Sequence, residues 1–433
     1  MKKYTFILFL FFTTSLFGTE LFTIDKNNKI IATQNPENTI GLVLDEVIYH
    51  QILNEAAKEH IMDLPFFTQT LQFRLEKHKI IYDGLQITSK TKNGNVLLDI
   101  KPNLLTYKMF YNGQWVGIIS FVNGEILATF KISGKQYEMS KFKEKYILFE
   151  ATNSINSSNF ECGVEQLQSR QSNNNTESSF TPKCIELAID IDYYSRQTFA
   201  SDQETTNWAL AIISGVSQIY EAEFNVGVTV VHVQIWNTPD PYDTPALNGN
   251  AGGMLGELGN YWNTNNGAIN RDLVHLLSKR GNTGTGGIAW LGVLCNMGSG
   301  YAFSSVLNND TTYSFPNPSY TWNLMVVSHE MGHNIGSPHT HSCGWTADPA
   351  FAFVGGGIDD CGVVSGSASA CSPPAPSPPA GIGTIMSYCH VGGSGIVLDF
   401  HDIVVSQALT PGINAASCIT TCDYYGCTDP TAF

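Results

Sequence analysis

The stretch from His329 to His339 combines residue types and spacings that suit a metal site, since it reads H-E-x-x-H-x-x-G-x-x-H. On a helix, His329 and His333 lie four residues apart on one face, so both imidazoles can bind one metal ion. Gly336 can take the left-handed conformation that ends a helix, and His339 can then return as a third nitrogen ligand. Three protein ligands with an open fourth position are typical of catalytic zinc.

Glu330 stands one position after the first histidine of this motif. On a helix it can reach a water on the metal, but it is badly placed to ligate beside the two histidines. We therefore predict that it acts as a general base, a role worth about 10²–10⁴-fold in rate. The other interpretation, a helix whose histidines are only hydrogen-bonded, gives the acid and the third histidine no purpose.

The elements that must position this motif are predicted to form an α/β fold with a twisted, partly parallel sheet. Apolar periodicity predicts strands at 184–192, 226–236, 272–278 and 286–295, and helices at 201–225, 253–262, 321–335 and 400–409. Ser201 and Glu204 form a capping box at the start of the first of these helices.

Residues 20–165 are expected to be mainly β-structure, with a short helix over 39–60. Turn dipeptides such as Asn112-Gly113 and Asn123-Gly124 punctuate a meander of hairpins over 107–145. This part holds no metal or nucleophile constellation, and we interpret it as a propeptide domain that packs on the rest. The polar residues 166–183 follow as an exposed activation linker, with Arg170 and Lys183 as its trypsin-type cleavage points.

Residues 1–19 have the pattern of a secretory signal peptide. Lys2 and Lys3 precede an apolar run from Phe6 to Leu16, which is too short to span a membrane comfortably. No later stretch is long and apolar enough to span. All ten cysteines lie at Cys162 or beyond, and in an exported protein they are expected mostly in disulfides.

Charge divides the 433-residue chain, which is long enough for two domains. Lys and Arg nearly balance Asp and Glu over residues 20–184. Residues 185–433 carry only four Lys or Arg against twenty acids, a net charge of −16. This acidic half has no basic patch, which argues against nucleic acid or an anionic membrane as its partner.

Downstream of the histidines, residues 383–388 (Gly-Thr-Ile-Met-Ser-Tyr) resemble the Met-turn of the metzincin zinc peptidases. The segments that resemble the reprolysin-like (adamalysin-like) branch of that family are 185–188, 271–277, 287–295 and 326–336. The resemblance covers roughly residues 184–420. It implies a catalytic domain, taken as 184–422, with a mixed sheet above the cleft and the Met-turn below it.

The resemblance also implies roles for particular residues. Met386 is expected beneath the zinc as an apolar floor, and a substrate peptide is expected to add as a strand to the edge at 286–294. Tyr388 is at the position where astacins and serralysins carry a tyrosine that reaches the zinc or the oxyanion; the alternative is that it only packs in the turn. His341 and His390 are expected to be structural, since three histidines complete the ligand set.

The sequence departs from the reprolysin pattern in two places. Thr340 follows the third histidine where reprolysins usually carry Asp, and a His-Thr pair is also similar to the pappalysin-like branch. Reprolysins often bind calcium opposite the cleft, and Glu186 and Asp272 match two ligand positions. Thr421 stands where a ligating Asn is expected, so the alternative for these acids is a half-exposed place on each strand.

Cys162, in Cys-Gly-Val just before the linker, resembles the family's cysteine switch, in which a thiolate takes the fourth zinc position. The alternative is an ordinary disulfide cysteine. Family likeness implies a Cys295–Cys418 disulfide and leaves the other pairings open. Residues 423–433 resemble the start of a cysteine-bounded repeat, with Cys427 lacking a partner.

Together these observations predict an exported zinc endopeptidase made as a zymogen, with a zinc-bound water as nucleophile and proteins or peptides as substrates. The propeptide is its intramolecular inhibitor. Two other functions remain: a non-catalytic zinc-bearing binding module on the same fold, and a pappalysin-like peptidase with a different cleft.

Overall fold

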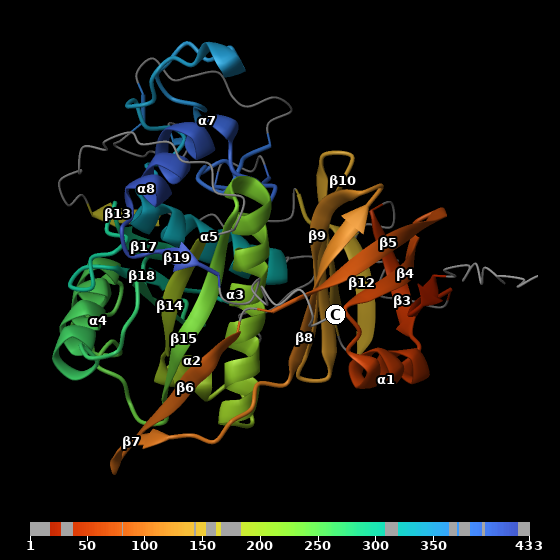
Figure 1. The fold of residues 1–433 in the computed structure, drawn as a ribbon, viewed down its shortest axis with the longest axis horizontal. Coiled ribbons are helices and arrows are strands. Elements are labelled where there is room, and N and C mark those ends of the chain that lie inside the picture. Colours follow the sequence, from red (N-terminus) through yellow and green to blue (C-terminus); the bar gives the residue numbers. More distant parts are fainter. Residues whose placement is uncertain are drawn as a thin grey trace, which may run out of the picture.

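Two β-sheets enclose a pair of long helices in the folded chain (Figure 1). The computed structural model describes residues 18–26, 38–79, 81–142, 144–152, 162–165, 183–307, 319–362, 370–371, 382–391 and 395–422. For residues 81–83 and 162–165 it describes only the backbone. The predicted signal peptide lies almost wholly outside these residues, as do Arg170, most of the linker and the C-terminal repeat.

The first sheet comes from the N-terminal part of the chain and curls round on itself. Its strands are β1 (Thr19–Glu20), β2 (Phe22–Ile24), β3 (Thr39–Leu44), β4 (Glu59–Phe66), β5 (Gln69–His78), β8 (Leu104–Tyr111), β9 (Gln114–Val122), β10 (Glu125–Ile132), β11 (Lys135–Phe142) and β12 (Lys145–Glu150). Their order across the sheet is β1-β4-β5-β8-β9-β10-β11-β12-β3-β2. Only Leu21 separates β1 from β2, and β2 also contacts β4, so the two ends of the sheet meet. We call this unit, with helix α1 (Glu46–Glu55), the N-terminal barrel.

Hairpins build this barrel, and the predicted meander over 107–145 is confirmed as β8 to β12. Asn112-Gly113 and Asn123-Gly124 both have positive φ at each residue, as a two-residue type I′ turn requires. The prediction of a helix over 39–60 is wrong at both ends, because residues 39–44 form strand β3, which pairs with β12 and β2, and β4 begins at Glu59. Asp45 then begins α1 by accepting a hydrogen bond from the Val47 N–H (2.9 Å).

The second sheet holds the predicted catalytic strands. Its strands are β13 (Cys162–Glu165), β17 (Gly287–Trp290), β18 (Tyr301–Ser304), β16 (Leu273–Leu277), β14 (Lys183–Ile191), β15 (Val226–Trp236), β6 (Ile81–Thr91) and β7 (Gly94–Leu97) in spatial order, with β19 (Thr420–Thr421) paired to β14. The pairs β14–β15, β14–β16 and β16–β18 are parallel, whereas β17–β18 is antiparallel. The predicted mixed sheet is therefore confirmed.

Helices cover both faces of the second sheet. Helix α3 (Asp202–Phe224) begins at the predicted capping box, where Ser201 Oγ accepts from the Glu204 N–H (3.1 Å). It is buried along most of its length because it lies between β15 and the barrel strands β8 and β9 (Figure 1). Helix α4 (Ala251–Asn265) packs on the other face. After α2 (Tyr193–Arg196) and α5 (Ser319–Ile335), the last helical stretch comprises α7 (Asp402–Val404), a π-turn (Val405–Leu409) and α8 (Thr410–Ala415).

The N-terminal part of the chain does not stay within its own barrel. Strands β6, β7 and β13 all come from residues 20–165, yet they lie at the two ends of the second sheet. Ile87 of β6 is buried in the same core as Val233 and Ile213. The predicted propeptide domain therefore shares a sheet and a core with the region that follows it.

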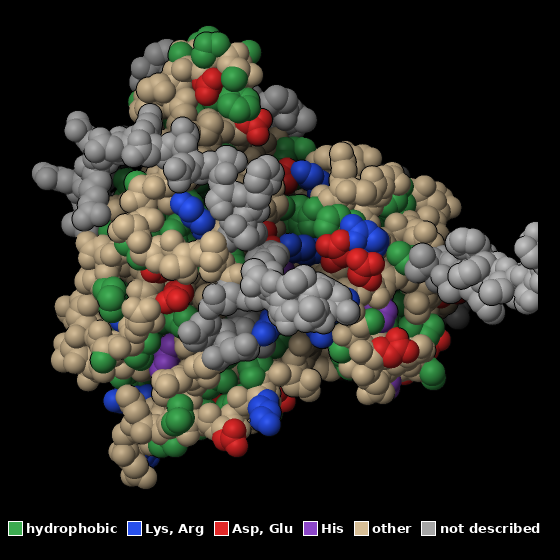
Figure 2. All heavy atoms as spheres, viewed as in Figure 1, with side chains coloured by type: hydrophobic (Ala, Val, Ile, Leu, Met, Phe, Trp, Pro, Cys, Tyr) green, Lys and Arg blue, Asp and Glu red, His purple; other side chains and the backbone are tan. Residues whose placement is uncertain are grey.

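Within the described residues, four disulfides tie the second half together: Cys184–Cys422, Cys295–Cys418, Cys343–Cys371 and Cys361–Cys389. The expected Cys295–Cys418 pair is confirmed. On the face shown in Figure 2, Lys and Arg side chains are scattered, and several lie beside Asp or Glu. No helix in the described ranges is long and apolar enough to cross a bilayer.

Candidate metal centre

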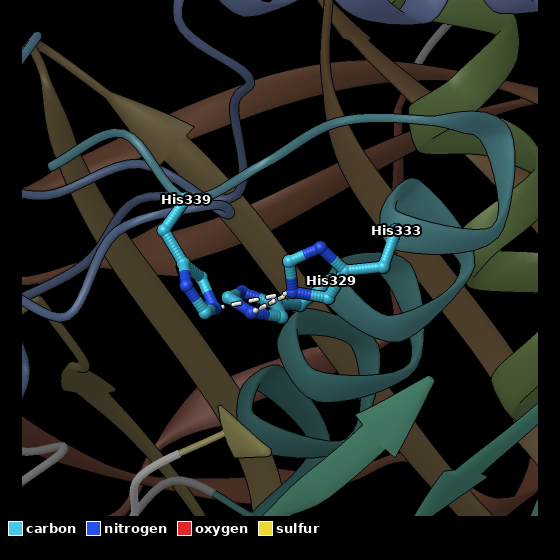
Figure 3. Close-up of side chains that lie close together, drawn as sticks. All are labelled: His329, His333 and His339. Carbon is cyan, nitrogen blue, oxygen red and sulfur yellow. Dashed lines mark hydrogen bonds between the residues drawn. The ribbon is translucent and has the colours of Figure 1, made fainter. Parts of the chain in front are cut away.

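Three imidazole rings converge on one point at the end of α5. His329 and His333 lie one turn apart on this helix, and His339 reaches them from the following loop (Figure 3). The Nε2 atom of His333 is 3.1 Å from Nε2 of His329 and 3.1 Å from Nε2 of His339. All three side chains are buried. The structure thus brings together the three residues predicted as metal ligands.

Backbone carbonyls hold two of these rings in the tautomer that a metal needs. His329 Nδ1 donates to the Ile385 carbonyl (2.5 Å), and His333 Nδ1 donates to the Ser337 carbonyl (2.6 Å). The lone pair of each ring is therefore on Nε2, where the rings face each other. Burial lowers the pKa of His329 to about 4, so its ring is neutral at pH 7.

The spacing of these nitrogens fits zinc. Two nitrogen lone pairs 3.1 Å apart repel each other unless a cation lies between them. Nitrogen ligands at 2.0–2.1 Å from a tetrahedral zinc ion are about 3.3–3.4 Å from each other. A set of three neutral imidazoles that leaves the fourth position to other groups is that of a catalytic site.

The end of α5 is built so that His339 can return. Gly336 has a φ of +131°, and its N–H donates to the Gly332 carbonyl (3.1 Å). From the facing side, the Gly292 N–H donates to the His333 carbonyl (2.9 Å), which satisfies one of the terminal acceptors of the helix. The loop after β17 therefore fixes the helix end from which the third ligand departs.

Glu330 is fully buried on α5 and faces strand β17. A Cβ atom placed on Gly287 of β17 would lie 2.3 Å from its Oε1 atom. Only a glycine therefore leaves room for the carboxylate at this point of the edge strand. The sequence predicts Glu330 from the motif, but it contains no short-range signal for its dependence on Gly287.

Met386 is fully buried beneath the helix. A Cβ on Gly332 would lie 2.8 Å from its sulfur, so the two residues are in close contact. The Met386 carbonyl accepts from both the N–H (3.1 Å) and the hydroxyl (3.2 Å) of Thr340. The turn predicted from residues 383–388 thus binds the loop of the third histidine through Met386 and the first histidine through Ile385.

Tyr388 is buried against the same histidines. Its ring centroid lies 4.5 Å from that of His339 and 6.4 Å from that of His329. The other two imidazoles predicted to be structural pack around the centre: His341 stacks on His339 at 4.9 Å, and His390 meets the Trp322 ring at 5.8 Å. Tyr388 is thus beside the metal ligands, and its catalytic role stays a prediction.

The two acids predicted for calcium lie side by side on β14 and just before β16. Asp272 Oδ2 accepts from the Glu186 N–H (2.8 Å), and Glu186 Oε2 accepts from Asn270 Nδ2 (3.0 Å). Burial raises the pKa of Asp272 to about 6. In the described ranges no third His, Cys, Asp or Glu side chain joins them. Calcium binding here is a prediction without support from a ligand cluster.

One further group of potential ligands lies near the centre, comprising Asp359, Cys361 and Cys389. The two cysteines are joined in a disulfide, so their sulfurs are not available as thiolates. Among the described residues the three histidines are therefore the only group of three that is ready to hold a metal.

The predicted switch residue, Cys162, begins strand β13, whose backbone lies along the edge of the second sheet. β13 pairs in parallel with β17, and Cys162 is the register partner of Gly287. Gly287 is the residue that Glu330 faces. The backbone of Cys162 thus lies beside the centre, while its side chain is outside the described part of the structure.

A family profile matches the region that holds these histidines. The sequence profile of metallo-peptidase family M12 (Reprolysin_5) matches residues 181–397, half of the chain. Disintegrin and metalloproteinase domain-containing protein 1 of Rattus norvegicus is 24% identical over 161 residues, 36% of this chain and 18% of that protein. The chain therefore spans less than a fifth of this relative. Metalloproteinase-II from Bacteroides fragilis aligns at 13% identity with a TM-score of 0.40, covering 72% of this chain and 88% of that one.

Proposed function

The chain belongs to the reprolysin-like peptidases of metallo-peptidase family M12, and from this membership we propose that it is an exported zinc endopeptidase made as a latent precursor. The observation that carries the proposal is the convergence of three buried imidazole nitrogens on the helix that also bears Glu330. The residues held there fit a zinc ion in number, donor type and spacing.

Each residue of the centre has a role in this proposal. His329, His333 and His339 hold the ion. When bound, zinc polarises the scissile carbonyl and lowers the pKa of a water to about 7. Glu330 takes the proton from the attacking water and passes it to the leaving amine. The Tyr388 hydroxyl donates a hydrogen bond to the oxygen that becomes negative in the transition state.

The substrate is expected to bind as an added strand along β17. One edge of β17 pairs with β18, and the other edge is the one that β13 occupies in this structure. A peptide bound there by main-chain hydrogen bonds passes directly over Gly287 and Glu330. Protein or peptide substrates fit such an edge because main-chain groups are common to all of them.

The proposal of latency is supported by strand β13, which occupies the edge of β17 where the substrate would bind. A substrate strand and β13 need the same N–H and C=O groups of residues 287–290, so they exclude each other. Cleavage of the linker between residues 165 and 184 removes the covalent connection between β13 and β14. Of the two predicted cleavage points, Lys183 begins β14 and pairs with both Val226 and Thr421, which argues against cleavage at Lys183.

Export is supported by the four disulfides, which form and persist in oxidising compartments. The predicted signal peptide provides the route. The alternative is a binding module that carries zinc without turnover. Such a module would not require a general base, so it does not explain the buried Glu330.

The test is hydrolysis of a peptide library by the cleaved protein, before and after removal of metal with a zinc chelator and again after zinc is restored. We expect cleavage that the chelator abolishes and zinc restores. Zinc bound at one equivalent per chain with no hydrolysis of any peptide would instead favour the binding module.

A further inference from the structure

We propose that the N-terminal barrel stays bound after the linker is cut, as a non-covalent subunit whose Glu138 caps the zinc helix α5. This inference rests on the proposed latent peptidase only for the cleavage step. Its partner is the chain's own N-terminal fragment. Linker cleavage then frees the edge of β17 without removing the barrel.

Glu138 of β11 makes the contact that ties the barrel to α5. Its Oε1 accepts from the Ser319 N–H (3.1 Å) and, at a longer 3.4 Å, from the Tyr320 N–H, and its Oε2 accepts from the Thr321 N–H (2.8 Å). The carboxylate is fully buried. The first N–H groups of a helix have no partner within it, and a negative charge beside them is favourable. A barrel residue therefore satisfies the start of the helix that ends in the metal centre.

Two hydroxyl pairs surround this cap. Thr129 Oγ1 lies 2.8 Å from Thr321 Oγ1, and Ser120 Oγ lies 3.0 Å from the Tyr320 hydroxyl. All four side chains are buried. Separating the barrel from α5 would leave these polar groups, together with Glu138, to be solvated again or to remain unpaired.

The barrel fragment is also attached through the second sheet, at the end opposite β13. Strand β6 pairs with β15 from His232 to Trp236, and Ile87 is buried in the shared core. Thr88 Oγ1 lies 3.0 Å from His232 Nε2. None of these contacts involves the linker, so its cleavage leaves them unchanged.

β13 is held far less strongly. It is a four-residue strand that pairs with β17 alone, and it immediately precedes the linker. Once the linker is cut, β13 has a free C-terminal end and a partner on one side only. The two attachments of the N-terminal fragment are therefore separable: β13 leaves the cleft, while β6, Glu138 and the hydroxyl pairs keep the barrel in place.

The experiment introduces a site for a specific protease into residues 171–182 of the full-length chain and cleaves it to completion. Native mass spectrometry and size-exclusion chromatography then report whether the two fragments remain together. We expect a 1:1 complex at micromolar concentration. Fragments that separate fully, while the C-terminal fragment keeps its helical circular dichroism, would overturn the proposal.

Glu138→Gln tests the cap. It removes the charge and one of the two carboxylate oxygens, so we expect the dissociation constant of the cleaved complex to rise about 30-fold or more. Glu144→Gln, in the same barrel but 89% exposed at its side chain, is the matched control and should leave it unchanged. Equal dissociation constants for wild type and Glu138→Gln would contradict the role of the cap.

Thr129→Val provides a milder second variant in case Glu138→Gln does not fold, and it should weaken the complex in the same direction. Hydrogen exchange at residues 319–321 gives a readout that a general loss of stability would not single out. These amides should be protected in the cleaved complex and exchange faster in either variant. Because mass and exchange need no turnover, a failed peptidase assay leaves this result interpretable.

Discussion

At the residue scale, Glu330 is the acid in the motif that is not one of the three convergent ligands. We predict that Glu330→Gln keeps zinc, because His329, His333 and His339 are unchanged. Turnover should fall at least about 10²-fold, since an amide cannot accept the proton of the attacking water. Metal content by mass spectrometry and hydrolysis of a fluorogenic peptide check the two halves of the prediction. Normal zinc with activity within tenfold of wild type would exclude Glu330 as the base.

Tyr388 allows a sharper kinetic distinction. If its hydroxyl meets only the transition-state oxygen, Tyr388→Phe should lower kcat by about 10²-fold and leave KM nearly unchanged. If the ring only packs on His339, kcat should stay the same, because Phe preserves that contact. Steady-state kinetics of the cleaved enzyme separate the two, and a melting temperature equal to wild type shows that the packing is intact.

The convergence of His329 and His333 could be predicted from spacing, because i and i+4 on a helix share a face whatever surrounds it. The acceptors that orient them could not. Ile385 and Ser337 contribute backbone carbonyls, and every residue has one, so side-chain type contains no signal for that role. The requirement for glycine at position 287 could not be predicted either. A Cβ atom there would clash with Glu330, which lies on a helix more than thirty residues away in the sequence.

At the element scale, β17 and α5 must approach closely for Glu330 to lie beside the proposed substrate strand. Gly287→Ala would put a methyl group 2.3 Å from a carboxylate oxygen of Glu330. We therefore expect the rate of peptide hydrolysis to fall at least about tenfold while zinc stays bound. Gly256→Ala in α4 is the control, since nothing lies within 4 Å of its Cβ position. It should leave activity unchanged and stabilise the helix by up to about 1 kcal/mol.

An unchanged kcat/KM for Gly287→Ala would mean that the strand and helix can separate without loss, and that Glu330 does not depend on their contact. Parallel loss of zinc and activity would indicate a broader disruption of the fold. Measuring both on one preparation distinguishes these results.

The type of most catalytic elements was predictable, because long periodic segments such as 201–225 and 226–236 mark helix and strand clearly. The sheet to which a strand belongs was not. β6 and the barrel strands alternate in the same way, and only the burial of Ile87 against Val233 in three dimensions assigns β6 to the second sheet. The same limit applies to β13, whose pairing depends on an edge formed over a hundred residues later.

At the scale of the whole molecule, the proposed latency raises the question whether Cys162 contributes more than its backbone. If the thiolate closes the metal site, uncleaved Cys162→Ser precursor should hydrolyse peptide at least about tenfold faster than uncleaved wild type, since a hydroxyl is a poor zinc ligand at neutral pH. The linker is checked as intact by mass. If strand pairing of β13 alone blocks the cleft, both precursors should be equally inactive. A wild-type precursor that is already fully active, or Cys162 found in a disulfide, would exclude the switch.

The junction between the barrel and α3 contains a buried carboxylate whose contribution to stability should depend on pH. Glu221 of α3 is buried and accepts from His78 Nε2 (2.8 Å) and Lys108 Nζ (2.5 Å), both on barrel strands. Burial raises its pKa, but the hydrogen bonds and charges of these two partners lower it by more than burial raises it, so the net pKa lies below the ordinary 4.5. A carboxyl group whose pKa is depressed on folding stabilises the protein above its ordinary pKa, and this stabilisation is lost as the pH falls below that value.

We therefore predict that the contribution of Glu221 to the free energy of unfolding decreases as the pH falls below about 5. Between about pH 5 and about pH 3, the wild-type chain should accordingly lose more stability than Glu221→Gln. At pH 7 this variant should be destabilised by about 3 kcal/mol, because Lys108 and His78 lose their buried partner. A double-mutant cycle with Lys108→Gln isolates the pair, since neighbouring buried charges are not additive. Urea denaturation of the four proteins at both ends of the pH range measures the coupling. Additive single effects, or equal pH slopes for wild type and Glu221→Gln, would show that this charge does not hold the barrel to the catalytic helices.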